Sequence, residues 1–144
     1  MRNDFLAALA AIVGENSLLA GERDTAAYLT DWRKQFRGHA LCVVRPASAA
    51  EVSAAVRLCA QAGVAIVPQG GNTSLCGGSV PAGVRAEIVL SLSRMNRVRE
   101  LDALNNTITV EAGCVLADVQ RAASDADRLF ALSLGAEGSC QIGG

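Results

Sequence analysis

Hydrophobic residues recur every three to four positions near the start of the chain, over residues 5–13. This spacing is typical of an amphipathic helix that packs one face on a core. Asp4 stands where a helix cap is favoured, and Gly14 can end the helix in a left-handed conformation. Residues 16–38 show a weak and polar pattern, so we expect a solvated connection there.

A second helix is predicted over residues 48–62 by its apolar face and by its two ends. Ser48 and Glu51 have the spacing of a capping box, in which the serine accepts from the third helical amide and the glutamate reaches back to the cap. Gly63 is well suited to end this helix. Cys59 lies on the apolar face, and we expect it in the core.

Short apolar runs flank this helix at residues 41–45 and 64–67, and both predict strands. Strand, helix and strand then form a βαβ unit, whose two strands should be parallel with a right-handed crossover. Later apolar segments predict a further strand, a hairpin and a last helix at 87–92, 97–102 with 107–112, and 115–126. The hairpin follows from the polar turn between its two runs.

A glycine-rich stretch, residues 68–81, leaves the second strand of the βαβ unit. Glycines let the main chain approach a ligand, and successive N–H groups can converge into an anion-binding nest. Ligands usually bind at the carboxyl ends of parallel strands, which favours a site here. A simple surface turn is the alternative that this composition leaves open. Additional side-chain donors are available from Asn72, Thr73, Ser74 and Ser79.

Composition places the chain among packed globular domains and excludes several partners. It has 144 residues, 51% of them hydrophobic, so it is one domain or part of one. A net charge of −1 and few aromatic residues give no basis for binding nucleic acid or an anionic membrane. No apolar run reaches the roughly 18 residues that a membrane span needs.

The five cysteines are widely spread and form no C-x-x-C pair, which argues against a disulfide framework and a zinc site. This usage suits a reducing compartment, and we expect a cytoplasmic protein. His39 is the only histidine. A lone histidine is more often a surface or packing residue than a catalytic base, so we assign no catalytic residue and no metal ligand.

Neither common nucleotide motif is present. The glycines do not have the G-x-G-x-x-G spacing of a dinucleotide fingerprint, and a phosphate loop would need a lysine beside Gly77 or Gly78. Lys34 is the only lysine, so anion binding would depend on arginine or on backbone groups. A second glycine-rich stretch, residues 133–144, ends the chain without an evident closing strand.

Three ordered motifs carry a family resemblance: residues 68–81, T-I-T-V-E-A-G at 107–113, and L-S-L-G-A-E-G-S-C-Q-I-G-G at 132–144. Together they resemble the FAD-binding domain of the vanillyl-alcohol oxidase and p-cresol methylhydroxylase superfamily. Within it the chain is most similar to the D-2-hydroxyacid dehydrogenase branch, which includes D-lactate dehydrogenases, D-2-hydroxyglutarate dehydrogenases and the glycolate oxidase FAD subunit. The resemblance covers residues 28–144.

The resemblance implies an α+β fold of the p-cresol methylhydroxylase type. A small parallel βαβ subdomain would be followed by a mixed or antiparallel sheet subdomain, incomplete at the C-terminus. We expect an N-terminal helix and connecting segment over residues 1–40 and a truncated FAD-binding domain over 41–144.

The resemblance also implies which residues contact FAD. Pro68 would preset the turn, and the pyrophosphate would be wrapped by Gln69, Gly70, Gly71, Asn72, Thr73, Ser74 and Leu75, with Gly77, Gly78 and Ser79 continuing the cradle. The second loop would run along the cofactor toward the flavin through Gly135, Gly138, Ser139, Ile142 and Gly143. Residues 111–113 are a weaker match, because 107–112 also reads as a core strand.

The sequence departs from the family pattern at three places. Ser74 stands where glycine is frequent, so it is expected to adopt a glycine-like conformation unless the loop shifts. Cys76 replaces a frequent valine and should be inert. Ala131 replaces a proline that is common before the second loop.

The implied reaction is the oxidation of a D-2-hydroxy acid to a 2-oxo acid by hydride transfer to FAD, with an electron acceptor other than NAD. The resemblance implies that the base, the substrate arginines and any metal ligands lie beyond the matched region, in a C-terminal domain that we expect to be missing from this chain. Two alternatives remain, a non-catalytic FAD-binding module and a truncated fragment without activity of its own.

Overall fold

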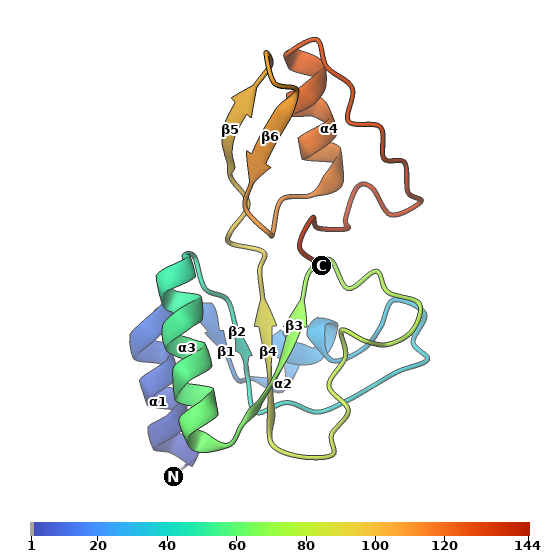
Figure 1. Cartoon of the computed structure of the whole chain (residues 1–144). Coiled ribbons are helices and arrows are strands. Elements are labelled where there is room, and N and C mark those ends of the chain that lie inside the picture. Colours follow the sequence, from blue (N-terminus) through green and yellow to red (C-terminus); the bar gives the residue numbers. More distant parts are fainter. Residues whose placement is uncertain (1) are drawn as a thin grey trace.

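The computed structural model describes residues 2–144 as a sheet flanked by two helices, followed by a hairpin with one further helix (Figure 1). The first part consists of helices α1 (Arg2–Val13), α2 (Glu22–Thr25) and α3 (Ala49–Ala62) and strands β1 (Leu18–Leu19), β2 (Val43–Val44), β3 (Ala65–Gln69) and β4 (Glu87–Ser91). The second part consists of β5 (Val98–Asp102), β6 (Thr107–Val110) and α4 (Leu116–Asp125). Among the described residues, no helix is long and apolar enough to cross a membrane.

The four-stranded sheet has the order β1-β2-β4-β3. Strands β2 and β3 each pair in parallel with β4, and β1 is antiparallel to β2. The predicted βαβ strands are therefore parallel, but they are not neighbours, because β4 lies between them. All five residues of β4 are buried, as expected for the central strand of a covered sheet.

The core of this part lies between the sheet and the helices α1 and α3, which run side by side in Figure 1. Leu9 from α1, Ile88 from β4, and Cys42 are fully buried in it. Cys59 belongs to the same cluster, as its helical position predicted. Burial raises the pKa of the Cys42 thiol to about 12, with a smaller contribution from Cys59, so this thiol is unreactive at neutral pH.

The ends of α3 form largely as predicted. The Ser48 hydroxyl accepts from the Glu51 amide at 3.2 Å, and Gly63 ends the helix in the left-handed conformation, with φ 66° and ψ 23°. The Glu51 carboxylate reaches back to the amide of Ala47 at 2.8 Å, one residue before the position that a capping box uses.

The N-terminal predictions were wrong in two respects. Helix α1 already includes Arg2, so Asp4 lies in its first turn, where a carboxylate favours the helix dipole, and does not precede the helix. Gly14 has φ 84° but ψ 145°, an extended conformation accessible to glycine, and not the left-handed helical one.

The segment expected to be a solvated connection is also more ordered than predicted. It contains β1, which extends the sheet, and α2. Ser17, Thr25 and Asp31 are buried within it. Its polar sequence gives no sign of this order, because the order comes from contacts with distant parts of the chain.

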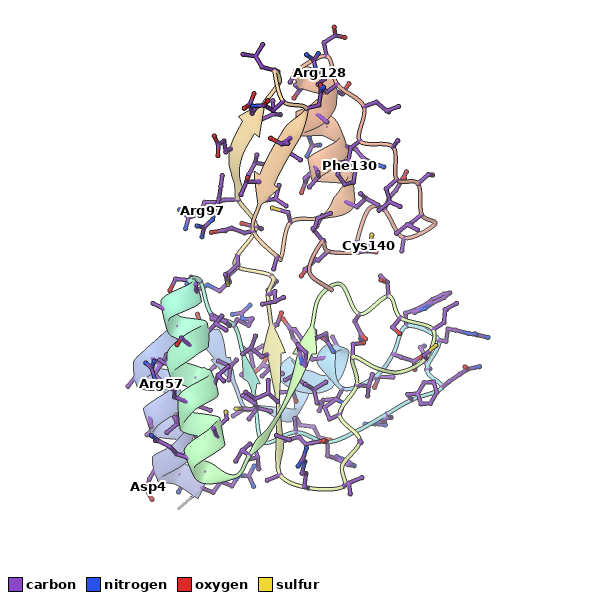
Figure 2. The ribbon with its side chains drawn as sticks, viewed as in Figure 1. Asp4, Arg57, Arg97, Arg128, Phe130 and Cys140 are labelled. Atoms are coloured by element: carbon purple, nitrogen blue, oxygen red, sulfur yellow. The ribbon has the colours of Figure 1, made fainter. Side chains whose placement is uncertain are left out.

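The second part is a hairpin packed on α4. The carboxylate of Asp102 closes the turn by accepting from the amides of Leu104 and Asn105, each at 3.0 Å. Arg128, at the far end of this part in Figure 2, donates to the Asn106 side chain at 2.6 Å and to the Ala103 carbonyl at 2.7 Å. The predicted apolar face of α4 is confirmed by its buried residues, Leu116, Val119 and Ala123.

Glu111 connects the hairpin with the chain that enters it. Its side chain is 2% exposed, and its carboxylate accepts from the Arg97 amide at 3.0 Å and from the Arg99 guanidinium at 2.9 Å. The hydrogen bond from the Arg97 backbone amide lowers the pKa of Glu111. The hydrogen bond from the Arg99 side chain and the charges of both arginines lower this pKa further. The charged carboxylate therefore stabilises the folded state.

This arrangement predicts a pH dependence of stability. Because the Glu111 pKa is lower in the folded than in the unfolded chain, its contribution is present above the ordinary glutamate pKa of about 4.3 and is lost as the pH falls through the folded value. We expect Glu111→Gln to lower the free energy of unfolding at pH 7 and to make it fall less between pH 7 and 3. Urea unfolding at several pH values measures both.

The matched control is Glu100→Gln, since Glu100 is exposed on β5 of the same hairpin. It should leave the pH dependence of the wild type unchanged. An equal pH dependence for wild type and Glu111→Gln would contradict the role of Glu111.

Candidate functional site

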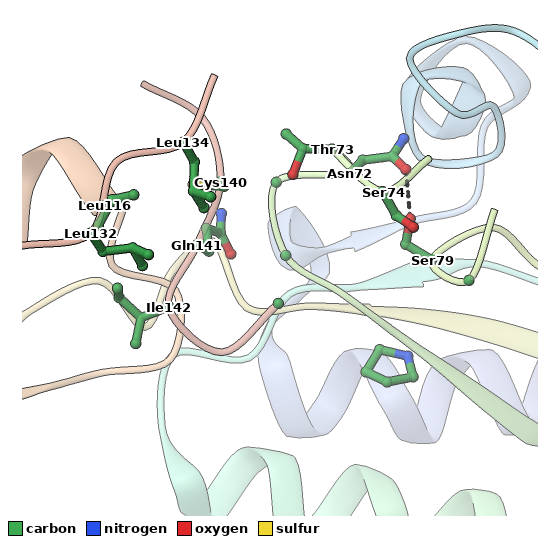
Figure 3. Close-up of a pocket in the computed structure, with 15 residues that line it drawn as sticks. Asn72, Thr73, Ser74, Ser79, Leu116, Leu132, Leu134, Cys140, Gln141 and Ile142 are labelled. Atoms are coloured by element: carbon green, nitrogen blue, oxygen red, sulfur yellow. Dashed lines mark hydrogen bonds between the residues drawn. The ribbon is translucent and has the colours of Figure 1, made fainter. Parts of the chain in front are cut away.

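A cavity of about 520 Å³ lies between the glycine-rich loop after β3 and the C-terminal stretch that follows α4 (Figure 3). The loop lines it with Pro68, Gly70, Gly71, Asn72, Thr73, Ser74, Gly78 and Ser79. The other side contributes Leu116, Leu132, Leu134, Cys140, Gln141, Ile142 and Gly144. The two glycine-rich stretches of the sequence thus form one site.

The two walls of the cavity differ in chemistry. The loop wall carries backbone groups and small polar side chains, while the opposite wall is formed largely by Leu132, Leu134 and Ile142 (Figure 3). Among residues 2–144, no charged side chain lines the cavity. Such a site suits an amphipathic ligand, whose polar part would be bound by neutral donors.

The loop offers a run of free backbone donors. In the described chain, no acceptor is bound by the N–H groups of Gly70, Gly71, Asn72, Thr73 and Ser74. Asn72 has a φ of 53°, a left-handed conformation that asparagine tolerates better than most residues. Consecutive amides around a left-handed residue can form a concave anion-binding nest.

The side chains of Gln69 and Asn72 hold the loop in place. Gln69 is buried, and its Nε2 donates to the carbonyls of Tyr28 at 2.9 Å and Ser79 at 2.7 Å. Asn72 Nδ2 donates to the Thr30 carbonyl at 2.8 Å and to Ala27 at 3.3 Å, while its Oδ1 accepts from the Ser79 hydroxyl at 2.8 Å. The predicted donors of Asn72 and Ser79 are therefore already used within the chain.

The C-terminal stretch is pinned beside the segment that leads into α4. The Leu116 amide donates to the Cys140 carbonyl at 3.0 Å, the Ile142 amide to Cys114 at 2.9 Å and the Gly143 amide to Ala112 at 2.7 Å. The Ala117 amide donates to Glu137 at 2.9 Å. The first amides of α4 are thus satisfied by this stretch, so its N-terminus does not add donors to the cavity.

The two loops touch where only glycine fits. A Cβ on Gly71 would lie 1.9 Å from the Ser139 carbonyl oxygen, and one on Gly70 would lie 2.9 Å from the Cα of Gly144. The chain of one loop therefore packs directly on the chain of the other. Gly70, Gly71 and Gly144 at this contact also line the cavity.

The structure brings some of the predicted site residues together and leaves others apart. Those that line the cavity are Pro68, Gly70, Gly71, Asn72, Thr73, Ser74, Gly78, Ser79 and Ile142. Those outside its lining are Gln69, Leu75, Gly77, Gly135, Gly138, Ser139 and Gly143. Of these, Leu75 is 56% exposed, Gly77 packs on the Phe36 ring, and Gly143 packs on Ala112.

One local prediction for the loop was wrong, and one of the two alternatives left open for Ser74 is excluded. Pro68 does not preset a turn: it belongs to β3 and pairs with Leu90, which is possible because β3 is an edge strand. Ser74 does not take a glycine-like backbone conformation; the loop residue with a left-handed backbone is Asn72. The Ser74 hydroxyl instead accepts from the Cys76 amide at 3.2 Å.

Sequence reasoning missed the apolar wall. The residues not foreseen are Leu116, Leu132, Leu134, Cys140, Gln141 and Gly144. Leu132 and Leu134 are 45% and 46% exposed in a segment without regular structure, where no hydrophobic period marks them. In the structure, Leu132 is anchored by Gln120, which donates to its carbonyl at 2.7 Å. Residues 111–113, the weaker match, do not line the cavity.

Comparison with known proteins places the chain among flavin-binding domains. A family model described as an FAD binding domain matches residues 40–144. A putative mitochondrial D-lactate dehydrogenase of Schizosaccharomyces pombe is 40% identical over 121 residues, covering 84% of this chain and 23% of the relative. A probable mitochondrial D-2-hydroxyglutarate dehydrogenase of Oryza sativa subsp. indica is 36% identical over 144 residues, covering 100% of this chain and 25% of the relative. The chain thus spans about a quarter of the length of these curated relatives.

A solved structure supports the fold. The structure of p-cresol methylhydroxylase with substrate bound superposes with a TM-score of 0.77, at 18% identity, over 95% of this chain and 27% of that one. The predicted α+β fold of the p-cresol methylhydroxylase type is confirmed, with only part of the homologous chain represented here.

The loop contact predicts a difference between two glycines that both line the cavity. We expect Gly71→Ala to lower the free energy of unfolding by about 1–3 kcal/mol, because its Cβ would collide with the Ser139 carbonyl. Gly78→Ala is the control, since a Cβ there meets nothing within 4 Å. Urea unfolding without ligand measures both, and equal stability of the two variants would show that the loops do not touch as described.

Proposed function

This chain belongs to the FAD binding domain family, and we propose that it forms the cofactor-binding part of a flavin-dependent D-2-hydroxyacid dehydrogenase. The resemblance to the vanillyl-alcohol oxidase and p-cresol methylhydroxylase superfamily is confirmed, and FAD is the cofactor of this family. The reaction and the substrate remain proposals, since the chain spans a quarter of its relatives.

The residues of the cavity fit FAD. The pyrophosphate of FAD carries two negative charges and many acceptor oxygens, and the loop offers free amides from Gly70 to Ser74 without an opposing carboxylate. The apolar wall matches the uncharged ring systems of the cofactor. The run of free amides beside the cavity is the observation that carries the proposal.

We assign the pyrophosphate to the loop residues Gly70, Gly71, Asn72, Thr73, Ser74, Gly78 and Ser79, which line the cavity. The hydroxyls of Thr73 and Ser74 can add donors. Ile142, Leu132 and Leu134 would cover the apolar part of the cofactor. The other predicted residues, such as Gln69, Gly77 and Gly143, would support the two loops from outside the cavity.

When bound, FAD supplies a hydride acceptor for oxidation of a 2-hydroxy acid to a 2-oxo acid. The chain's own contribution is to bind and orient the cofactor with pre-organised amides and to exclude water from its apolar side. We propose a D-2-hydroxy acid as substrate, because relatives are named as D-lactate and D-2-hydroxyglutarate dehydrogenases. No residue of this chain is assigned to catalysis, and substrate contacts would come from another part of the protein.

Two further proposals concern the surroundings of the enzyme. The electron acceptor is a compound other than NAD and is left unassigned. The cytoplasmic location stays a prediction, and both relatives described above carry the word mitochondrial in their names. The alternative function is a flavin-binding module without turnover.

The test is a titration of the purified chain with FAD, followed by flavin fluorescence and absorbance. We expect binding, and we expect no reduction of the flavin by D-lactate or D-2-hydroxyglutarate, because we assign no substrate contact to this chain. The same acids should bleach the flavin absorbance of the chain joined to the remaining length of a relative. Absence of FAD binding would refute the proposal. Bleaching of the flavin absorbance when the acids are added to the chain alone would refute the claim that substrate contacts come from another part of the protein.

A further inference from the structure

We propose that residues 27–38, which precede the region matched by the family model, are a structural part of the cofactor site. We call this segment the clasp. Through Gln69 and Asn72, which act as positioning residues, the clasp fixes the conformation in which the loop presents its free amides. This inference rests on the proposed function, because its main readout is the affinity for FAD.

Hydrogen bonds tie the loop to the clasp across more than 40 residues of sequence. The carbonyls of Ala27, Tyr28 and Thr30 accept from the loop side chains, with Gln69 bound to Tyr28 at 2.9 Å and Asn72 bound to Thr30 at 2.8 Å. All three acceptors are backbone atoms, so the clasp needs a particular conformation and no particular side chains at these positions.

The same two side chains also hold the loop's far end. Gln69 Nε2 donates to the Ser79 carbonyl at 2.7 Å, and Asn72 Oδ1 accepts from the Ser79 hydroxyl at 2.8 Å. Each amide therefore joins three pieces of chain, namely the clasp, the beginning of the loop and its end. The left-handed backbone of Asn72 is fixed at the centre of this network.

Packing supports the hydrogen bonds. A Cβ on Gly77 would lie 2.5 Å from the Phe36 ring, and one on Gly38 would lie 1.8 Å from the Pro81 carbonyl oxygen. The clasp thus follows the loop from Asn72 to Pro81, and in Figure 1 the two segments run side by side.

The clasp has its own internal bonds. The Asp31 amide donates to the Phe36 carbonyl at 3.0 Å, the Gly38 amide donates to Leu29 at 2.9 Å, and the Phe36 amide donates to the Asp31 carboxylate at 2.7 Å. These bonds close a turn that can hold its shape beside a glycine-rich loop, which has little rigidity of its own. A pre-formed loop binds its ligand without the entropy cost of ordering it.

The first test removes the Asn72 side chain without straining the backbone. Asn72→Gly keeps access to the left-handed conformation but deletes the bonds to Thr30, Ala27 and Ser79. We expect the dissociation constant for FAD to rise about tenfold or more. The matched control is Asn106→Gly, since Asn106 has φ 54° and lies in the hairpin turn, away from the cavity.

Trp32, the only tryptophan, lies in the clasp and is 62% exposed, so it reports on this segment directly. Without FAD, acrylamide should quench the Trp32 fluorescence more strongly in Asn72→Gly than in the wild type. Quenching in Asn106→Gly should equal that in the wild type. This readout separates a loosened clasp from a general loss of stability, which thermal unfolding of both variants records.

A second pair of variants tests the packing contact. Gly77 and Gly83 have φ of 69° and 70°, but a Cβ meets the Phe36 ring only at Gly77 and nothing within 4 Å at Gly83. Because the two φ values are nearly equal, Gly77→Ala and Gly83→Ala place alanine in a similarly disfavoured φ region. We expect weaker FAD binding only in Gly77→Ala.

The outcomes distinguish this inference from the proposed function. FAD binding by Asn72→Gly and Gly77→Ala as tight as that of their controls would overturn the role of the clasp while leaving the proposed function intact. A wild-type chain that does not bind FAD would overturn both.

Discussion

The direct contact between two glycine-rich loops is the constraint on which the site depends. Gly70 and Gly71 lie so close to Ser139 and Gly144 that no Cβ fits between them. The loops leave different parts of the fold, one from the end of β3 and the other after α4. Their contact joins the four-stranded sheet to the hairpin part, and both parts contribute residues to the cavity.

Around this contact, side-chain amides hold the loop, and its free backbone N–H groups take the place that charged side chains have in many anion sites. The side-chain amides of Gln69 and Asn72 donate to carbonyls of the clasp and the loop, and backbone N–H groups of the loop stay free beside the cavity. A buried amide is costly unless its donors and acceptors are satisfied, and here each bond also fixes the loop. On the proposed assignment, side chains thus give structural support and the backbone binds the ligand.

Local chemistry made several elements predictable from sequence. The caps of α3 at Ser48 and Gly63 depend on neighbouring residues alone, and the apolar face of α4 follows from its spacing. The glycine loop could be located because its residues follow an apolar strand. Its detailed conformation could not, since the left-handed residue is Asn72 and is held by carbonyls more than 40 residues earlier.

Long-range pairing explains the other differences. Nothing in the segments 41–45 and 64–67 indicates that β4 inserts between them, because strand order is decided by contacts across the whole sheet. The same holds for β1 and for the clasp, which lie in a polar segment without periodicity. Leu132 and Leu134 could not be predicted as cavity residues, because the positions of apolar side chains in a loop follow no regular spacing.

The absence of charged side chains from the cavity lining, within residues 2–144, bears on how the site responds to its surroundings. Mobile ions screen charges on a protein surface over roughly 10 Å at moderate ionic strength, but they act weakly on amide dipoles in direct contact with a ligand. On the proposed assignment, the affinity for the cofactor would therefore depend less on salt than at a site built from arginine or lysine.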